Sequence, residues 1–439
     1  MAKLCGTFTD PARLHVDVMM VGSIGKGTDP TLGVHAISAV GLTNQPKFLL
    51  MTAFIAMNTG VTALVARYKG SGDKEQANLM VRQGLMVSFI ATLILSALGT
   101  IFARQMVLFM GSTEETVTVM ATQYLQIQMI GFLTMALTST ITASLRAVGD
   151  SKTCMIYNLI ANLVNVVCNW LLIYGNLGFP ELGVAGASIA TVIGQFVAFL
   201  IALSVIVRGN GFLKLEFHLG FRPHADALRK MIDIGIPAMI EQLLMRAGII
   251  IFSKAVAGLG TSAYATHQVC MNIHALSFMT GQAFAVSATS LVGQSLGKRR
   301  EDMAQAYCHK TRSVGFASAI ILMLIFIFFG GDIVALYNSD TTIIKTGAHI
   351  MLFIAFMQPF QTSQFIIAGG LRGAGDTKAT AMITSVTVLI LRPVLAIILI
   401  RMGFGLYGAW MAFASDQLVR SLLVLLRYNN GKWKLAYRK

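Results

Sequence analysis

The chain has 439 residues, of which 55% are apolar and only 12% are charged. Soluble domains carry about 25% charged residues, so this composition excludes a soluble enzyme, a disordered tail and a disulfide scaffold. A membrane-spanning helix needs about 20 mostly apolar residues, and the apolar content suffices for about twelve such helices. The net charge of +15 would suit a nucleic-acid partner in a soluble protein, but its distribution along this chain indicates membrane topology instead.

Eleven apolar stretches are predicted to be membrane-spanning helices. They lie at about 37–66, 79–103, 116–143, 153–175, 184–207, 231–257, 262–293, 314–329, 346–368, 379–400 and 405–426. A twelfth, Ala12–Ile24, has 13 residues and would measure about 20 Å against a hydrocarbon core of about 30 Å. The first helix is therefore predicted to be shortened, with either a true start upstream of Met1 or a truncation.

Lysine and arginine gather on alternate connections between these helices. One set of connections holds 23 of the 34, and the opposite set holds five, at Lys26, Arg104, Lys254, Lys345 and Arg401. Positive residues favour the cytoplasmic side of a membrane, so the first set is predicted to be cytoplasmic. An even number of helices then places both termini in the cytoplasm.

The chain also repeats itself. Leu145–Lys152 reads Leu-Arg-Ala-Val-Gly-Asp-Ser-Lys, and Leu371–Lys378, which lies 226 residues later, reads Leu-Arg-Gly-Ala-Gly-Asp-Thr-Lys. Val65–Gly70 corresponds to Val292–Gly297 at an offset of 227 residues. Both copies fall on the predicted cytoplasmic side, so the repeats are parallel, as in the two halves of some transporters.

These observations predict an all-α polytopic membrane protein of about twelve transmembrane helices in two parallel-repeat six-helix bundles. The predicted bundles are residues 1–208 and 228–428, joined by a cytoplasmic linker at 209–227. A basic cytoplasmic tail is predicted at 429–439.

Particular strings of residues carry a family resemblance. They are Asp17–Gly22 in the first helix, Ala39–Leu42 in the second, Ala265–Gln268, Asn272-Ile273, Ser277–Met279, Ala288–Gln294 and the two Leu-Arg turns. Together they resemble the multidrug and toxic compound extrusion (MATE) family in its bacterial NorM-like form. The resemblance implies multidrug efflux by secondary antiport, in which organic, often cationic compounds leave in exchange for H⁺ or Na⁺. It implies no cofactor beyond that coupling ion.

The resemblance also implies a cation-coupling site in the first bundle, formed by Asp17 with Asn165, Asn169 and Thr191. The residues themselves support this, because Asn162, Asn165 and Asn169 recur at helical spacing on one face. A carboxylate in a membrane cavity can hold a proton, a sodium ion or a cationic drug. The alternatives are an Asp17 near solvent at a frayed helix end, and asparagines that only hydrogen-bond between helices.

In the second bundle the resemblance implies a substrate or secondary cation site at Glu241, with His267, Gln268 and Gln361. Gln361 stands where much of the family has an acidic residue, and Asn169 where some relatives have Asp, so the roles of those two carboxylates do not transfer. Alternatively, Glu241 forms a structural ion pair with Arg246 or Arg392, and His267 packs in the core.

Other features point away from catalysis. Gly293–Gly297 fits the Gly-x-Ser-x-Gly hydrolase pattern, which requires a strand-to-helix elbow, but here it ends a predicted membrane helix. Asp416 and Arg420, spaced i, i+4 in the last helix, are predicted to form a self-neutralising pair. No catalytic or metal-binding residues are predicted, and the chain is not expected to be an enzyme.

Two alternatives to an antiporter remain open at this point. Arg246, Arg392 and Arg420 would suit a related-fold flippase for lipids or lipid-linked oligosaccharides, whose phosphates need positive charge. The short first helix would suit a decayed, non-transporting membrane protein. The expected partners are small-molecule organic cations or drugs and membrane lipid, not nucleic acid. The expected state is a monomer in the bacterial cytoplasmic membrane.

Overall fold

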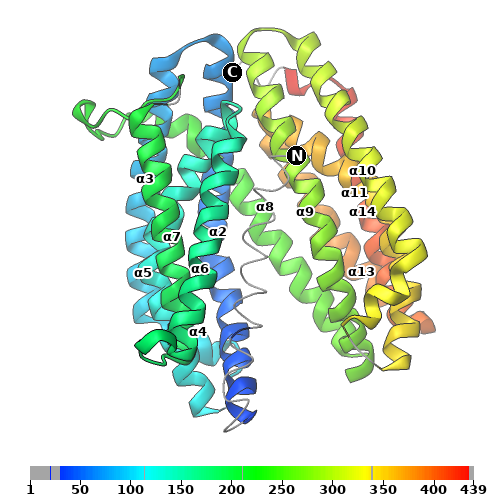
Figure 1. Cartoon of the computed structure of the whole chain (residues 1–439). Helices are drawn as coiled ribbons and strands as arrows, with labels where there is room; N and C mark the ends of the chain where they lie inside the picture. The colour runs from blue at the N-terminus through cyan, green and yellow to red at the C-terminus, as the bar shows by residue number, and fades with distance from the viewer. Residues whose placement is uncertain (1–19, 21–29, 113, 210, 338–339, 435–439) are drawn as a thin grey trace. The chain divides into compact units, whose positions relative to one another are not determined.

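The computed structural model describes Met20 and residues 30–112, 114–209, 211–337 and 340–434 (Figure 1). Apart from Met20, the predicted short first helix lies outside these residues, and Asp17 lies outside them too. The helices are α2 (Pro30–Ser71), α3 (Lys74–Ile101), α4 (Ala103–Phe109), α5 (Glu115–Ala147), α6 (Ser151–Tyr174), η1 (Asn176–Gly178), α7 (Gly183–Arg208), η2 (Phe217–Leu219), α8 (Ala225–Ala257), α9 (Thr261–Gly297), α10 (Glu301–Ala335), α11 (Thr341–Gly373), α12 (Thr377–Val386), η3 (Thr387–Leu391), α13 (Arg392–Leu399), η4 (Ile400–Phe404) and α14 (Gly405–Asn429).

The eleven predicted apolar stretches coincide with these helices except at Phe102, between α3 and α4, and at Gly175, just after α6, which confirms the all-α membrane fold. Ten helical segments of the described chain are long and apolar enough to cross a membrane, and the last of them, Thr377–Asn429, has 53 residues. A straight helix of that length would measure about 80 Å, far more than one crossing requires. The chain instead turns at Gly403 and Gly405, which have φ of +93° and +53°, and α13 then packs against α14. The segment therefore supplies two crossings, as the sequence predicted.

The chain forms two compact units, Met1–Val61 with Lys74–Met231 and Thr62–Asp73 with Ile232–Lys439. In the first unit α5 packs against α3 and α7, and α7 packs against α6. In the second unit α11 packs against α10 and α14, and α14 packs against α13. These helices correspond in order at the repeat offset, so the same packing pattern occurs in both units. The division at 208, 227 and 428 stays a prediction.

The repeated Leu-Arg turns have the same backbone structure in both copies. In the first, Asp150 N donates to Leu145 O at 2.9 Å, and Gly149 has a φ of +100°. In the second, Asp376 N donates to Leu371 O at 2.9 Å, and Gly375 has a φ of +88°. This is the Schellman pattern of helix termination, in which glycine takes the left-handed position that side chains disfavour.

A close helix crossing forms where the segment Thr62–Asp73 joins the second unit. Gly70 on α2 faces Gln294 and Gly297 on α9, and a Cβ added to Gly297 would lie 1.9 Å from Arg67 O and 2.9 Å from Gly70 Cα. The two glycines occupy equivalent positions of the internal repeat. Only glycine permits two helix backbones to approach this closely.

Gly297→Ala is expected to destabilise the protein by about 1–3 kcal/mol, because backbone cannot move aside as a flexible side chain can. Thermal unfolding of the purified protein in detergent measures this loss. Gly41→Ala is the matched control, because a Cβ there meets no described atom within 4 Å. Equal melting temperatures for the two variants would contradict the crossing as the structure shows it.

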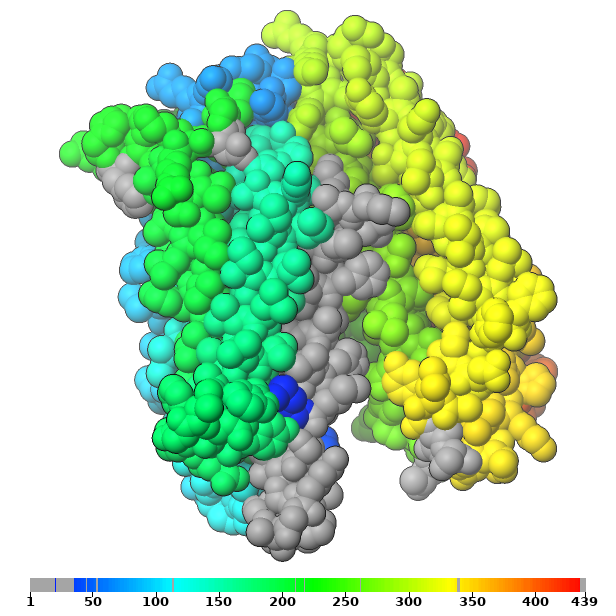
Figure 2. All heavy atoms as spheres, viewed as in Figure 1, coloured from blue at the N-terminus to red at the C-terminus, as the bar shows by residue number. Residues whose placement is uncertain are grey.

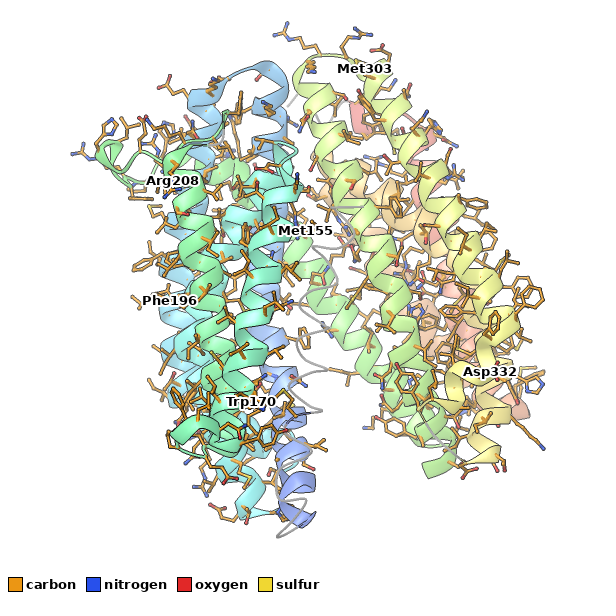
Figure 3. The ribbon with its side chains drawn as sticks, viewed as in Figure 1. Met155, Trp170, Phe196, Arg208, Met303 and Asp332 are labelled. Atoms are coloured by element: carbon orange, nitrogen blue, oxygen red, sulfur yellow. The ribbon has the colours of Figure 1, made fainter. Side chains whose placement is uncertain are left out.

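Large apolar side chains cover the outer surfaces of both units, as expected for residues that meet lipid. Trp170 on α6 is 46% exposed and Phe196 on α7 is 47% exposed. Figure 3 shows both residues on the first unit. Trp170 lies near one edge of this unit, at the C-terminal end of α6, and Arg208 lies near the opposite edge, at the C-terminal end of α7. On the second unit, Phe328 on α10 is 73% exposed. Figure 2 shows one face of the molecule, on which atoms of α6, α7 and α10 lie at the surface.

Candidate functional site

The polar residues predicted in the first unit gather between α6 and α7. Asn165 and Asn169 are fully buried, Thr191 is nearly so, and Asn165 Nδ2 donates to Thr191 Oγ1 at 3.4 Å. The two helices approach closely here, since a Cβ on Gly194 would lie 2.9 Å from Ala161 O. Three of the four residues predicted for cation coupling therefore share one interhelical region.

The region contains a buried oxygen that can accept a further hydrogen bond. Asn165 Oδ1 is buried and has no hydrogen-bond partner among the described residues. Buried amide oxygens almost always accept a hydrogen bond or bind a cation, so this oxygen can accept from water or coordinate an ion. Tyr174 at the end of α6 donates to Met20 O at 2.8 Å, and Met20 follows Asp17 by three residues. Asp17 itself lies outside the described residues.

In the second unit, Glu241 is buried and bonded from two sides. Arg372 Nη2 donates to Glu241 Oε1 at 2.6 Å, and Thr384 Oγ1 donates to the same oxygen at 3.1 Å. The expected structural partners of Glu241 were Arg246 and Arg392, and that expectation is wrong because the ion pair forms with Arg372. Arg372 belongs to the repeated Leu-Arg motif. It lies 131 residues from Glu241 along the chain, so the pairing could not be predicted from local sequence spacing.

His267 and Gln268 do not share one environment. His267 is 1% exposed and lies among aromatic rings, with centroid distances of 5.6 Å to Phe252 and 5.5 Å to Trp410. Gln268 is exposed, and its Nε2 donates to Tyr264 Oη at 2.7 Å. The surroundings of His267 fit the packing alternative.

Gln361 on α11 lies beside a histidine that sequence analysis did not single out. Its Nε2 is 3.2 Å from His274 Nε2 on α9, and both side chains are buried. One turn away, Gln358 Nε2 donates to Ser277 Oγ at 2.9 Å. Buried amide oxygens at Gln358, Gln361 and Gln364 have no partner among the described residues. These glutamines recur at i, i+3, i+6, and this spacing could have predicted a polar face on α11.

A second buried ion cluster joins α14 to the preceding helix. The predicted pair of Asp416 with Arg420 is present, and Arg392 donates to the same Asp416 Oδ2, with its Nε at 3.0 Å. The Arg392 guanidinium also lies 4.1 Å from the centroid of the Phe413 ring. All three ionic side chains are at least 95% buried, and together they carry one excess positive charge.

The hydrolase-like pattern has no catalytic geometry. Ser295 lies inside α9, is 3% exposed, and donates to Leu291 O at 2.8 Å within the helix. A nucleophilic serine needs an exposed hydroxyl on a strand-to-helix turn. The pattern is therefore part of a membrane helix.

Comparison with known proteins gives one family. The MatE family model matches residues 15–171 and 237–398, which is one segment in each half of the repeat. A probable multidrug resistance protein NorM from Thermotoga maritima is 28% identical over 401 residues, covering 91% of this chain and 86% of the relative. An uncharacterised transporter, YisQ of Bacillus subtilis, is 29% identical and covers 91% of this chain and 88% of its own length.

Solved structures agree with this in fold. A crystal structure of MATE in the bent conformation matches with a TM-score of 0.90 at 19% identity, covering all of this chain and 95% of the other. A MOP superfamily transporter from Pyrococcus furiosus, described as having a binding pocket of reverse polarity, matches with a TM-score of 0.89 at 19% identity, covering 99% of this chain and 94% of the other. The family model spans more than half of the chain, and the chain belongs to the MATE family of multi-pass membrane transporters.

Proposed function

We propose that the protein is a secondary antiporter that exports organic, often cationic compounds in exchange for H⁺ or Na⁺. The observation that carries this proposal is the buried polar region of Asn165, Asn169 and Thr191, beside which the coupling carboxylate Asp17 is expected. Polar side chains are costly in the membrane and usually mark an ion or substrate pathway. The relatives named as multidrug resistance proteins support the same class of substrate.

The proposed mechanism is an exchange of cations at acidic sites. Entry of H⁺ or Na⁺ from outside neutralises the Asp17 carboxylate, removes its attraction for a cationic substrate and releases that substrate outward. The coupling ion then leaves on the inside, and the freed carboxylate binds the next organic cation there. We expect the protein to act without a cofactor, as a monomer in the bacterial cytoplasmic membrane. Its charge distribution predicts that both termini lie in the cytoplasm.

The flippase alternative is less well supported by the buried arginines. Arg392 and Arg420 both donate to Asp416, so one of their two positive charges is already neutralised inside the protein. A site for lipid phosphates needs guanidinium groups that can turn their donors to the ligand. We therefore keep export of organic cations as the proposed function.

Cells that express the chain are expected to export a fluorescent organic cation such as 4′,6-diamidino-2-phenylindole. Collapsing the proton and sodium gradients should stop export while ATP remains, because the driving energy comes from the ion gradients alone. Export rates with and without ionophores, together with cellular ATP levels, measure this. Export that continues with both gradients collapsed would exclude antiport.

A further inference from the structure

The Glu241 site is formed by side chains from three helices of the second unit. Glu241 comes from α8, Arg372 from the last turn of α11, and Thr384 from α12. Arg372 and Thr384 both donate to Oε1, at 2.6 Å and 3.1 Å. The site therefore already contains a cation, and that cation is part of the protein.

The two charged partners differ in exposure. The Glu241 side chain is 4% exposed, whereas the Arg372 side chain is 17% exposed. A buried carboxylate needs a compensating cation or a proton, and arginine supplies a charge that does not titrate. The long side chain of Arg372 is therefore the partner that can move away from the ion pair, while Glu241 stays in place among the helices.

We propose that Arg372 is the resident counter-ion of Glu241 and that transported cations must displace it from the carboxylate. This inference rests on the proposed function and names a specificity-determining residue for it. Exchange of one cation for another keeps the buried carboxylate neutralised at every step. Arg372 therefore prevents cations that bind the carboxylate weakly, including small inorganic ions, from occupying the site.

The geometry also selects the chemical class of substrate. The guanidinium of Arg372 donates a short hydrogen bond to Glu241 Oε1. A cation that replaces Arg372 without donating a hydrogen bond leaves this buried oxygen with one hydrogen bond fewer, which costs free energy. Amidinium, guanidinium and protonated amine groups can replace the bond, whereas a quaternary cation cannot. The Glu241 site therefore favours cations that carry N–H donors.

The arrangement is a feature of the second half of the repeat. Arg146 stands at the position equivalent to Arg372 in the first copy of the Leu-Arg motif. Arg146 is consequently a matched control, because it occupies the same turn of the motif in the other copy.

The test measures binding of 4′,6-diamidino-2-phenylindole, an amidinium probe, and of tetraphenylphosphonium, which has no N–H donor. Binding to purified full-length protein is measured by calorimetry at mildly alkaline pH, where protons compete least. Arg372→Gln is expected to bind the amidinium probe about tenfold more tightly than the wild type. The reason is that the probe no longer has to displace the charge-assisted hydrogen bond between Arg372 and Glu241. The gain should be smaller for tetraphenylphosphonium, absent in Arg146→Gln, and lost when Glu241→Gln is added to Arg372→Gln.

An unchanged or weaker affinity in folded Arg372→Gln would overturn the proposal, as would a gain that persists in the double variant. If Arg372→Gln does not fold, Arg372→Lys decides, because it keeps the charge but loses the planar donor geometry. We expect a gain of about threefold for this variant, and no gain would overturn the proposal. Failure of the wild type to export any cation would instead count against the proposed function.

Discussion

Asp416→Asn is expected to destabilise the second unit by about 3–5 kcal/mol, because removing one partner of a buried ion pair leaves the other charge uncompensated. In this protein two guanidinium groups, those of Arg392 and Arg420, depend on the one carboxylate. Asparagine keeps the size of the side chain but removes the charge. The melting temperature of the purified variant, compared with wild type in the same detergent, measures the effect.

A control separates buried from exposed charge. Asp302 pairs with Arg300 at 2.7 Å, and these side chains are 64% and 58% exposed. Exposed pairs contribute little because water and salt screen them, so Asp302→Asn should leave the melting temperature nearly unchanged. Equal losses in the two variants would mean that burial does not govern the contribution of Asp416.

A triple variant distinguishes the effect of an unbalanced charge from the effect of altered packing. Replacing Arg392, Asp416 and Arg420 together by leucine removes every charge from the cluster. Buried ion clusters replaced by apolar residues of similar size are often as stable as the original or more so. The triple variant is therefore expected to melt at a higher temperature than Asp416→Asn. If it melts lower, the cluster stabilises the unit by its geometry rather than by its charge balance.

The helices could be predicted from the sequence because each depends on a local property. Long apolar stretches must satisfy their backbone hydrogen bonds internally within lipid, and the helix does this without reference to distant residues. The Leu-Arg turns were recognisable for a similar reason, since Gly149 and Gly375 meet a local need for positive φ. Helix ends were placed less well, and α10 begins at Glu301 rather than near 314, because polar residues extend helices beyond the apolar core.

The candidate sites could be predicted only in part. Asn165 and Asn169 lie on one helix, so their shared face followed from helical spacing. The partners of Glu241 and Arg392 lie 131 and 24 residues away, and nothing in local spacing specifies such pairs. An ion pair across helices depends on which faces meet after packing. For this reason Arg372, Thr384 and His274 were identified only from the structure.

The other large effect is expected at the proposed coupling site. Asp17→Asn should abolish gradient-driven export of the amidinium probe while leaving membrane insertion normal. Asparagine preserves the size and hydrogen-bonding capacity of the side chain but cannot bind and release a proton, nor attract a cation by charge. Export in intact cells is the measurement, and the amount of protein in isolated membranes controls for insertion.

Glu241→Gln should weaken export only partially and shift the preference among substrates. Glutamine still offers an oxygen to Arg372 and Thr384, so the contacts between α8, α11 and α12 can persist without the negative charge. The carboxylate of Glu241 already has an arginine as its counter-ion, whereas the amides of Asn165 and Asn169 bring no charge to the region expected to receive Asp17. A carboxylate beside neutral oxygen ligands is a better site for a proton or a sodium ion than one that already pairs with an arginine. If Asp17→Asn exports normally and Glu241→Gln is inactive, this assignment is reversed, and coupling belongs to the second unit.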